Sequence, residues 1–166
     1  GYVPIGGVVI SGDIAATFDD RVFPGGLTYS GHPLATASIV ASIDAMSEEK
    51  VNENAAEIGE NVLGPGLRDL MDKHKIIGEV RGLGVFWALE LVTDRATREP
   101  LAPYGGTSAA MTELVAECKK RFLIPFTNFN RMHVVPPATV SEVEVKEGLA
   151  ILDDVFGVID AHYTGA

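Results

Sequence analysis

The sequence predicts a mixed fold, in which an α/β region with one strand and long helices is followed by a smaller α+β region. Residues 5–11 are a β-branched apolar run bounded by glycines, which is typical of a buried strand. Residues 34–46 are apolar on nearly every side of a helix, whereas apolar side chains alternate with a period of two over 83–91. The change of pattern predicts a boundary between residues 1–74 and 75–166.

The first region is expected to contain three helical segments after its strand. A serine and an aspartate within residues 11–13 can cap one or two helical turns. Pro33 suits the first turn of the next helix, because its missing N–H costs nothing there. Since residues 34–46 are apolar all round, we expect that helix to be buried. A longer amphipathic helix follows, and Gly-Pro-Gly at 64–66 predicts a kink or a new start before residues 67–74.

The second region is predicted to run strand, helix, two short strands and helix. After the strand at 83–91 and a polar loop, residues 111–118 place their apolar side chains on one face of a helix. Short strands are expected at 122–126 and 133–135. The last helix begins with a capping box at 141–144. Its expected buried stripe is Val145, Leu149, Leu152, Phe156 and Ile159.

Composition limits the possible partners of the chain. A length of 166 residues with 46% hydrophobic content is enough to bury a core, and the net charge of −10 offers no basic stripe for nucleic acid or an anionic membrane. No apolar run approaches membrane-spanning length. Cys118 is the one cysteine, so we expect no internal disulfide, no metal cluster and a cytoplasmic location. The first residues begin in an apparent strand without an initiator methionine, which suggests a fragment.

Several motifs that carry chemistry elsewhere are rejected here. Gly82-Leu83-Gly84 lacks the third glycine of a dinucleotide fingerprint and lies inside a strand pattern, so it indicates a bulge or a close backbone approach. Cys118 on an apolar helix face is most simply a core residue. The carboxylate pairs at 48–49 and 153–154 diverge by about 100° on a helix, so both are expected to lie in solvent.

The segment GGLTYSGHPLATASIV, at residues 25–40, gathers small hydrogen-bonding groups directly before a helix. A turn at a helix N-terminus presents unpaired backbone N–H groups, and Thr28 and Ser30 add hydroxyl donors. The segment therefore resembles an anion site. From the local pattern alone, a simple helix cap and turn is the alternative interpretation.

Four segments in order and spacing resemble one known family. They are TYSGHPLATASIVASIDAM (28–46), preceded by GYVPIGGVVIS (1–11), then GEVRGLGVFWALELVTDR (78–95), and the ending HVVPP…SEVEVKEGLAILDDVF (133–156). Together they are similar to the class III, or omega-type, aminotransferases, which are pyridoxal-phosphate enzymes of fold type I. The resemblance implies the end of the large PLP-binding domain, with an interdomain helix, over 1–74, and the small C-terminal α+β domain over 75–166.

The resemblance also implies a cofactor site shared across a homodimer. In that family, a threonine corresponding to Thr28 contacts the cofactor phosphate of the neighbouring subunit, helped by nearby backbone amides such as that of Leu27. The lysine that binds the cofactor would lie just upstream of Gly1, so we expect no catalytic residue in this chain and no activity from it alone. All six of its lysines lie in polar helical contexts.

A substrate role is less well defined by the resemblance. An arginine of the C-terminal domain often receives the substrate carboxylate in the family, and Arg131 is the nearest candidate. The more usual arginine position falls near Phe126, and ordinary ion pairing is the alternative role for Arg131. Arg81 is expected to be structural.

Two functions remain open from the sequence. The first is the C-terminal part of a transaminase that transfers an amino group between an amine or amino acid and a keto acid such as pyruvate. The second is a stand-alone α+β binding or dimerisation module without chemistry of its own.

Overall fold

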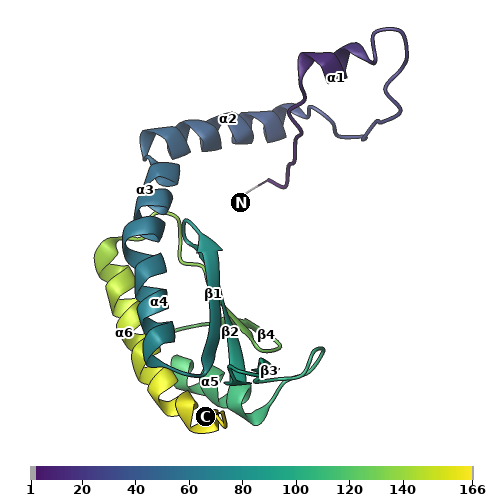
Figure 1. The fold of residues 1–166 in the computed structure, drawn as a ribbon. Helices are drawn as coiled ribbons and strands as arrows, with labels where there is room; N and C mark the ends of the chain where they lie inside the picture. The colour runs from purple at the N-terminus through teal and green to yellow at the C-terminus, as the bar shows by residue number, and fades with distance from the viewer. Residues whose placement is uncertain (1–2, 166) are drawn as a thin grey trace. The chain divides into compact units, whose positions relative to one another are not determined.

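The computed structural model describes residues 3–165 and divides the chain into two compact units, Gly1–Glu49 and Lys50–Ala166 (Figure 1). Each unit is described by itself below. The division falls earlier than the boundary predicted after residue 74, which concerned the domains of a larger enzyme and stays a prediction.

The first unit contains two helices and an extended N-terminal segment. Its helices are α1 (Gly12–Ala16) and α2 (Pro33–Glu48). The Ser11 side chain accepts from the N–H of Ile14 and so caps α1, as predicted. The strand predicted at 5–11 is wrong, because residues 4–11 have no regular structure. A strand needs a neighbour for its backbone N–H and C=O groups, and none forms within residues 3–49.

The helix α2 begins with Pro33 in its first turn, as the sequence predicts. Its expected burial is wrong, because no residue of α2 is buried, and Leu34 and Val40 keep 65% and 58% of their surface exposed. An all-round apolar helix can be buried only where other surfaces surround it, and the first unit supplies no such surface. The sequence pattern therefore predicts the helix correctly but not its environment.

One long helix with a widened turn opens the second unit. Its parts are α3 (Val51–Ile58), the π turn η1 (Gly59–Leu63) and α4 (Gly64–Lys73). The π turn ends two residues before Pro65, which has no N–H for the helical ladder, so the expected interruption takes the form of a widened turn. A Cβ at Gly59 would lie 2.0 Å from the carbonyl oxygen of Gly84, so only glycine allows this turn to touch the sheet.

An antiparallel sheet forms the centre of the second unit. Four strands run in the order β1-β2-β5-β4, and β3 pairs with β2. The strands are β1 (Ile77–Leu83), β2 (Phe86–Asp94), β3 (Glu99–Pro100), β4 (Phe126–Asn128) and β5 (Arg131–Val134).

The sequence predicted a single strand over 83–91, but these residues belong to a hairpin. Leu83 ends β1, and β2 begins at Phe86. Gly84, with φ of +54°, lies in the turn between β1 and β2. A Cβ at Gly82 would lie 2.5 Å from the Trp87 ring, which confirms the close approach predicted for this glycine. Residues 122–125 are not a strand either, because Phe122 (φ +61°) and Leu123 end the preceding helix, with the Leu123 N–H donating to the Cys118 carbonyl at 3.0 Å.

Three helices cover one face of the sheet (Figure 1): α4, α5 (Ala109–Lys120) and α6 (Glu142–Ile159), the last continued by the 3₁₀ turn η2 (Asp160–His162). The capping box at Ser141 and Glu144 is confirmed. Of the predicted stripe on α6, four residues are buried and Leu149 is partly buried. Core residues with at most 2% of their surface exposed come from every layer: Leu67, Leu89, Leu114, Cys118, Met132 and Phe156.

Candidate functional site

The turn before α2 holds the first group of candidate residues. The N–H of Ser30 donates to the carbonyl of Leu27 at 3.0 Å, and the N–H of His32 donates to that of Tyr29 at 3.2 Å. Gly31 takes a φ of +67°, which favours glycine. The segment is therefore a tight turn, closed by its own backbone, that ends where α2 begins.

Free hydrogen-bond donors of this segment lie in the turn as well as at the start of the helix. Pro33 has no N–H, and the N–H of Leu34 donates to Nδ1 of His32 at 3.3 Å. By contrast, the hydroxyl of Thr28 and the N–H groups of Thr28 and Tyr29 have no hydrogen-bond partner among residues 3–165, and these residues are exposed. A hydroxyl and two adjacent amides are donors of the kind that bind phosphate oxygens. The N–H of Leu27, the backbone amide expected to help bind the phosphate, likewise has no hydrogen-bond partner among residues 3–165, and the Leu27 carbonyl accepts from the N–H of Ser30.

Arg131 opens β5 in the second unit. In the sheet it faces Glu90 of β2 and Asn128 of β4, and it is half-buried. The Glu90 carboxylate pairs with Arg81 instead, with 2.5 Å between the guanidinium nitrogen and the carboxylate oxygen. Within the described part of the chain, Arg131 itself makes no ion pair. Its guanidinium is thus a fork of donors with no carboxylate bound in this structure.

Arg81 has the structural role that the sequence predicts. It bonds Glu79 of its own strand at 3.1 Å and Glu90 across the β1–β2 pair at 2.5 Å. The hydrogen bond that Arg81 donates to the Glu90 carboxylate is the main cause that raises the pKa of the Arg81 guanidinium above its usual range. These charges are therefore satisfied on the sheet surface.

Aromatic side chains gather beside Arg131 on the sheet face opposite the helices. The ring of His133 meets Phe126 edge-on at 5.2 Å and Phe86 at 6.1 Å between centroids. Phe86 and Phe126 remain 60% and 64% exposed. This face thus combines an unpaired guanidinium with an apolar aromatic surface, which can accept a molecule with an acidic end and an apolar body.

A buried histidine that the sequence analysis passed over ties α4 to α6. His74 is 4% exposed, and its ring nitrogens lie 2.6 Å from Asp153 and 2.7 Å from Asp160. Lys73 also bonds Asp153, at 2.5 Å, and the hydrogen bonds from Lys73 and then His74 lower the pKa of Asp153. The prediction that Asp153 lies in solvent is therefore wrong. No local pattern signals this cluster, because its partners are about eighty positions apart in the chain.

Nucleophilic side chains are poorly placed for chemistry in this chain. Cys118 is fully buried, and burial raises the pKa of its thiol to about 11, which leaves it protonated at neutral pH. All six lysines are exposed: Lys50, Lys73, Lys75, Lys119, Lys120 and Lys146. Three of them pair with carboxylates. A lysine that attacks a carbonyl needs burial or a cationic neighbour to lose its proton, and an exposed lysine has no such burial.

Within residues 3–165, no three histidine, cysteine, aspartate or glutamate side chains come together as a metal site would require. None of the helices formed by those residues combines the length and the apolarity needed to cross a membrane.

Comparison with known proteins shows which family the chain resembles. The family model "Aminotransferase class-III" matches residues 1–156. A 5-aminovalerate aminotransferase of Pseudomonas aeruginosa is 35% identical over 94% of this chain and 35% of its own length. A taurine–pyruvate aminotransferase of Bilophila wadsworthia is 31% identical over 98% of this chain and 37% of its own.

A solved structure gives the same likeness in three dimensions. The taurine:2-oxoglutarate aminotransferase of Bifidobacterium kashiwanohense, in complex with PLP and glutamate, matches with a TM-score of 0.86 and 36% identity, over 98% of this chain and 36% of that one. The chain thus spans about a third of the length of these relatives.

Proposed function

The chain belongs to the class-III aminotransferase family, and we propose that it forms part of a pyridoxal-phosphate-dependent transaminase. This enzyme transfers an amino group between an amine or amino acid and a keto acid such as pyruvate. The observation that carries the proposal is the family match over residues 1–156, together with the structural likeness at a TM-score of 0.86. The alternative of a stand-alone, non-catalytic binding or dimerisation module has no support among the relatives.

The proposal assigns the covalent step to a lysine outside these 166 residues. All six lysines of the chain are exposed, so none has the buried environment that such a residue needs. Residues 1–74 are then the last part of the large cofactor-binding domain, and residues 75–166 are the small domain. The chain by itself is expected to be inactive.

Thr28 is the residue proposed to hold the cofactor phosphate, across the interface of a homodimer. Its hydroxyl and the N–H groups of Thr28 and Tyr29 are exposed and free in residues 3–165, which suits an anion with several acceptor oxygens. The N–H of Leu27, also free among residues 3–165, is proposed to help bind the phosphate, while its carbonyl closes the turn. When bound, pyridoxal phosphate supplies the electron-withdrawing ring through which the amino group is exchanged.

Arg131 is the residue proposed to bind the acidic end of the substrate. Among residues 3–165 its guanidinium has no carboxylate partner, and Phe126 on the neighbouring strand offers an apolar contact on the same face. The relatives above are named for 5-aminovalerate and taurine, which are short amino acids with the amino group at one end and the acid at the other. We extend this substrate class, and a cytoplasmic location suited to the lone free Cys118, to the present protein.

The test of the proposal uses the complete enzyme. Thr28→Ala removes one donor to a charged acceptor, worth about 1.5–3 kcal/mol, so cofactor affinity should fall by roughly ten- to a hundred-fold. Ser38→Ala is the control, because the Ser38 hydroxyl bonds only the Leu34 carbonyl within α2. Cofactor titration followed by absorbance measures both variants, and equal affinities would contradict the role of Thr28.

Mixing subunits tests whether the contact is made across the dimer. Subunits with Thr28→Ala are exchanged with subunits whose cofactor lysine is replaced. If Thr28 acts on the neighbouring site, the heterodimer has one site with both defects and one with neither, so activity partly returns. If exchange restores no activity, the contact across the interface is rejected. The 166-residue chain given cofactor, an amine and pyruvate should show no turnover in the same assay.

A further inference from the structure

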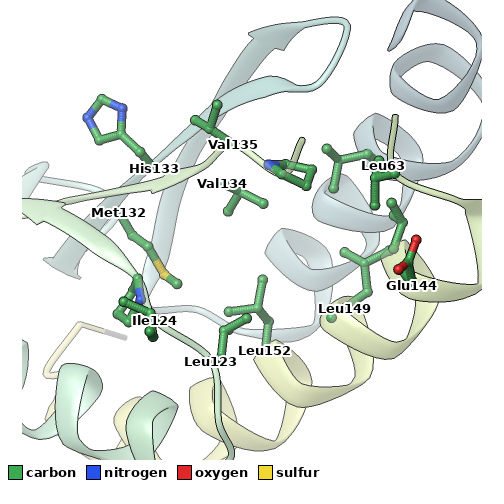
Figure 2. Close-up of a pocket in the computed structure, with 15 residues that line it drawn as sticks. Leu63, Leu123, Ile124, Met132, His133, Val134, Val135, Glu144, Leu149 and Leu152 are labelled. Carbon is green, nitrogen blue, oxygen red and sulfur yellow. The ribbon is translucent and has the colours of Figure 1, made fainter. Parts of the chain in front are cut away.

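A buried cluster of charged side chains joins the ends of α4 and α6, and the proposed function does not use it. Its centre is His74, which directly follows α4 and keeps only 4% of its surface exposed. Asp153 reaches His74 from α6, whereas the adjacent Leu152 points towards Met132 of β5 (Figure 2). Nε2 of His74 lies 2.6 Å from Asp153, and Nδ1 lies 2.7 Å from Asp160, which opens η2. Each ring nitrogen therefore has a carboxylate of its own.

Both carboxylates act as hydrogen-bond acceptors. Asp153 also accepts from the ammonium group of Lys73, at 2.5 Å, and this bond is the main cause that lowers the pKa of Asp153, followed by the bond from His74. Oδ1 of Asp160 accepts from the N–H of Ile76 at 3.2 Å, directly before β1. An ionised carboxylate has no proton to donate, so the protons of both short contacts come from the histidine ring.

The cations near His74 bind other groups. Lys73 bonds a carboxylate, Arg95 donates to the His74 carbonyl at 2.9 Å, and the ammonium of Lys75 lies 5.7 Å from the centre of a tyrosine ring. The ring of Phe156, at 6.0 Å between centroids, is an apolar neighbour. Burial among these groups disfavours a charged histidine, but a carboxylate in direct contact with each nitrogen favours it. The direct contacts decide the balance, because attraction between charges weakens with distance.

We propose that His74 is a proton-dependent clasp between α4 and α6, with a proton on each ring nitrogen while the clasp is closed. Loss of one proton to solvent leaves a nitrogen lone pair facing a carboxylate, so one of the two hydrogen bonds is lost. Residues 160–165 form a C-terminal strap that begins at the clasp and reaches the sheet, where the N–H of Thr164 donates to the Thr93 carbonyl at 2.8 Å. The clasp therefore fastens the strap and loosens as the pH rises.

Nitrogen NMR of the histidine rings in the 166-residue chain tests the proton count directly. At pH 8 a histidine in water is almost entirely neutral, whereas His74 should show both ring nitrogens protonated. His162 is the control in the same spectrum, because its ring is partly exposed and contacts only one carboxylate, that of Glu113, at 2.7 Å. The His162 ring should be neutral at that pH. A neutral His74 ring at pH 8 overturns the proposal.

Amide exchange at Ile76 measures the clasp itself, because this N–H donates to Asp160. His74→Gln retains a donor but no charge, so exchange should be roughly ten- to a hundred-fold faster than in the natural chain at pH 7, whereas His162→Gln should leave it unchanged. An unfolded histidine titrates near pH 6.5, so the clasp stabilises fully below that pH and is lost as the pH rises through the value at which the folded ring deprotonates. The two exchange rates should therefore converge at high pH, and a ratio that does not change with pH overturns the clasp.

Asp160→Asn is the second variant and keeps the proposal testable if glutamine at position 74 prevents folding. It removes one of the two charges with little change of shape, so the His74 ring should lose one proton at pH 8. Glu113→Gln is its control and should leave the His74 signals unchanged, because Glu113 contacts only His162. A His74 ring that keeps both protons in Asp160→Asn overturns the role of the paired carboxylates.

Discussion

The two compact units are built from similar apolar residues but bury them to very different extents. In the first unit, residues 3–49 include no buried residue at all, although α2 carries Leu34, Ile39, Val40 and Ile43 among its alanines. In the second unit, α4, α5 and α6 pack on the same sheet face, and all of their leucines except the partly buried Leu149 are buried. An amphipathic or apolar pattern is thus enough to make an element, but burial depends on whether the same unit supplies the opposing surface.

Separating the units should have the largest effect. Residues 50–166 expressed alone should keep a cooperative thermal melt, because the core lies entirely within them, and residues 1–49 alone should show none. The 166-residue chain should bind a hydrophobic dye more strongly than the 50–166 piece and should tend to self-associate, because the first unit exposes Val9, Phe23 and Leu34. A monodisperse 166-residue chain with one melt that is lost on separation would contradict this view and favour the stand-alone module.

A matched pair of core truncations tests the same contrast at single residues. Leu67→Ala in α4 removes a side chain with no exposed surface, so it should cost about 3–5 kcal/mol of unfolding free energy. Leu34→Ala in α2 removes one that is 65% exposed and should cost less than about 0.5 kcal/mol. Urea denaturation measures both. A comparable loss in the two variants would mean that the first unit is packed in solution after all.

The sequence predicted those parts of the fold that depend on local pattern. Helix starts at Ser11, Pro33 and Ser141 could be placed because capping residues act on backbone groups within three positions. The strand at 5–11 failed because pairing requires a second strand, which a run of apolar residues cannot reveal. The β1–β2 hairpin was merged into one strand because Leu83 and Val85 happen to continue the alternation of Trp87, Leu89 and Leu91, although Leu83 ends β1 and Gly84 turns the chain.

The candidate site also has parts that the sequence could predict and parts that it could not. Thr28 could be singled out because turn-forming residues cluster around it, and the free donors observed there suit the anion site expected. What the sequence could not show is that Nδ1 of His32 accepts from the N–H of Leu34 and so removes one donor from the start of α2. The cluster of His74, Asp153 and Asp160 was missed because only the packing of α4 on α6 brings these residues together.

Replacing Asp153 should give an intermediate, pH-dependent effect. Its pKa is lowered by Lys73 and then His74, so the carboxylate stabilises the fold above its unfolded pKa of about 3.9 and loses that contribution as the pH falls through the lower, folded value. Asp153→Asn should therefore cost about 1–2 kcal/mol at pH 7, allowing for partial exposure, and progressively less below about pH 4. Asp154→Asn is the control, since its side chain is exposed. Urea denaturation across pH measures both, and a constant difference would rule out the charged contact.

Removing a helix cap should give the smallest difference between the units. At the start of α6, which packs into the core, the Ser141 hydroxyl accepts from the N–H of Glu144. The Glu144 carboxylate in turn accepts from the N–H of Ser141. Ser141→Ala should therefore lower the unfolding free energy by about 1 kcal/mol.

The Ser11 hydroxyl makes the same kind of cap on α1, a helix of five residues with none buried. Because cooperative unfolding reports on the core of the second unit, Ser11→Ala should leave the measured unfolding free energy unchanged. Circular dichroism during urea titration separates the two variants. An equal loss from Ser11→Ala would show that α1 unfolds together with the core, and the energetic independence of the two units would then have to be abandoned.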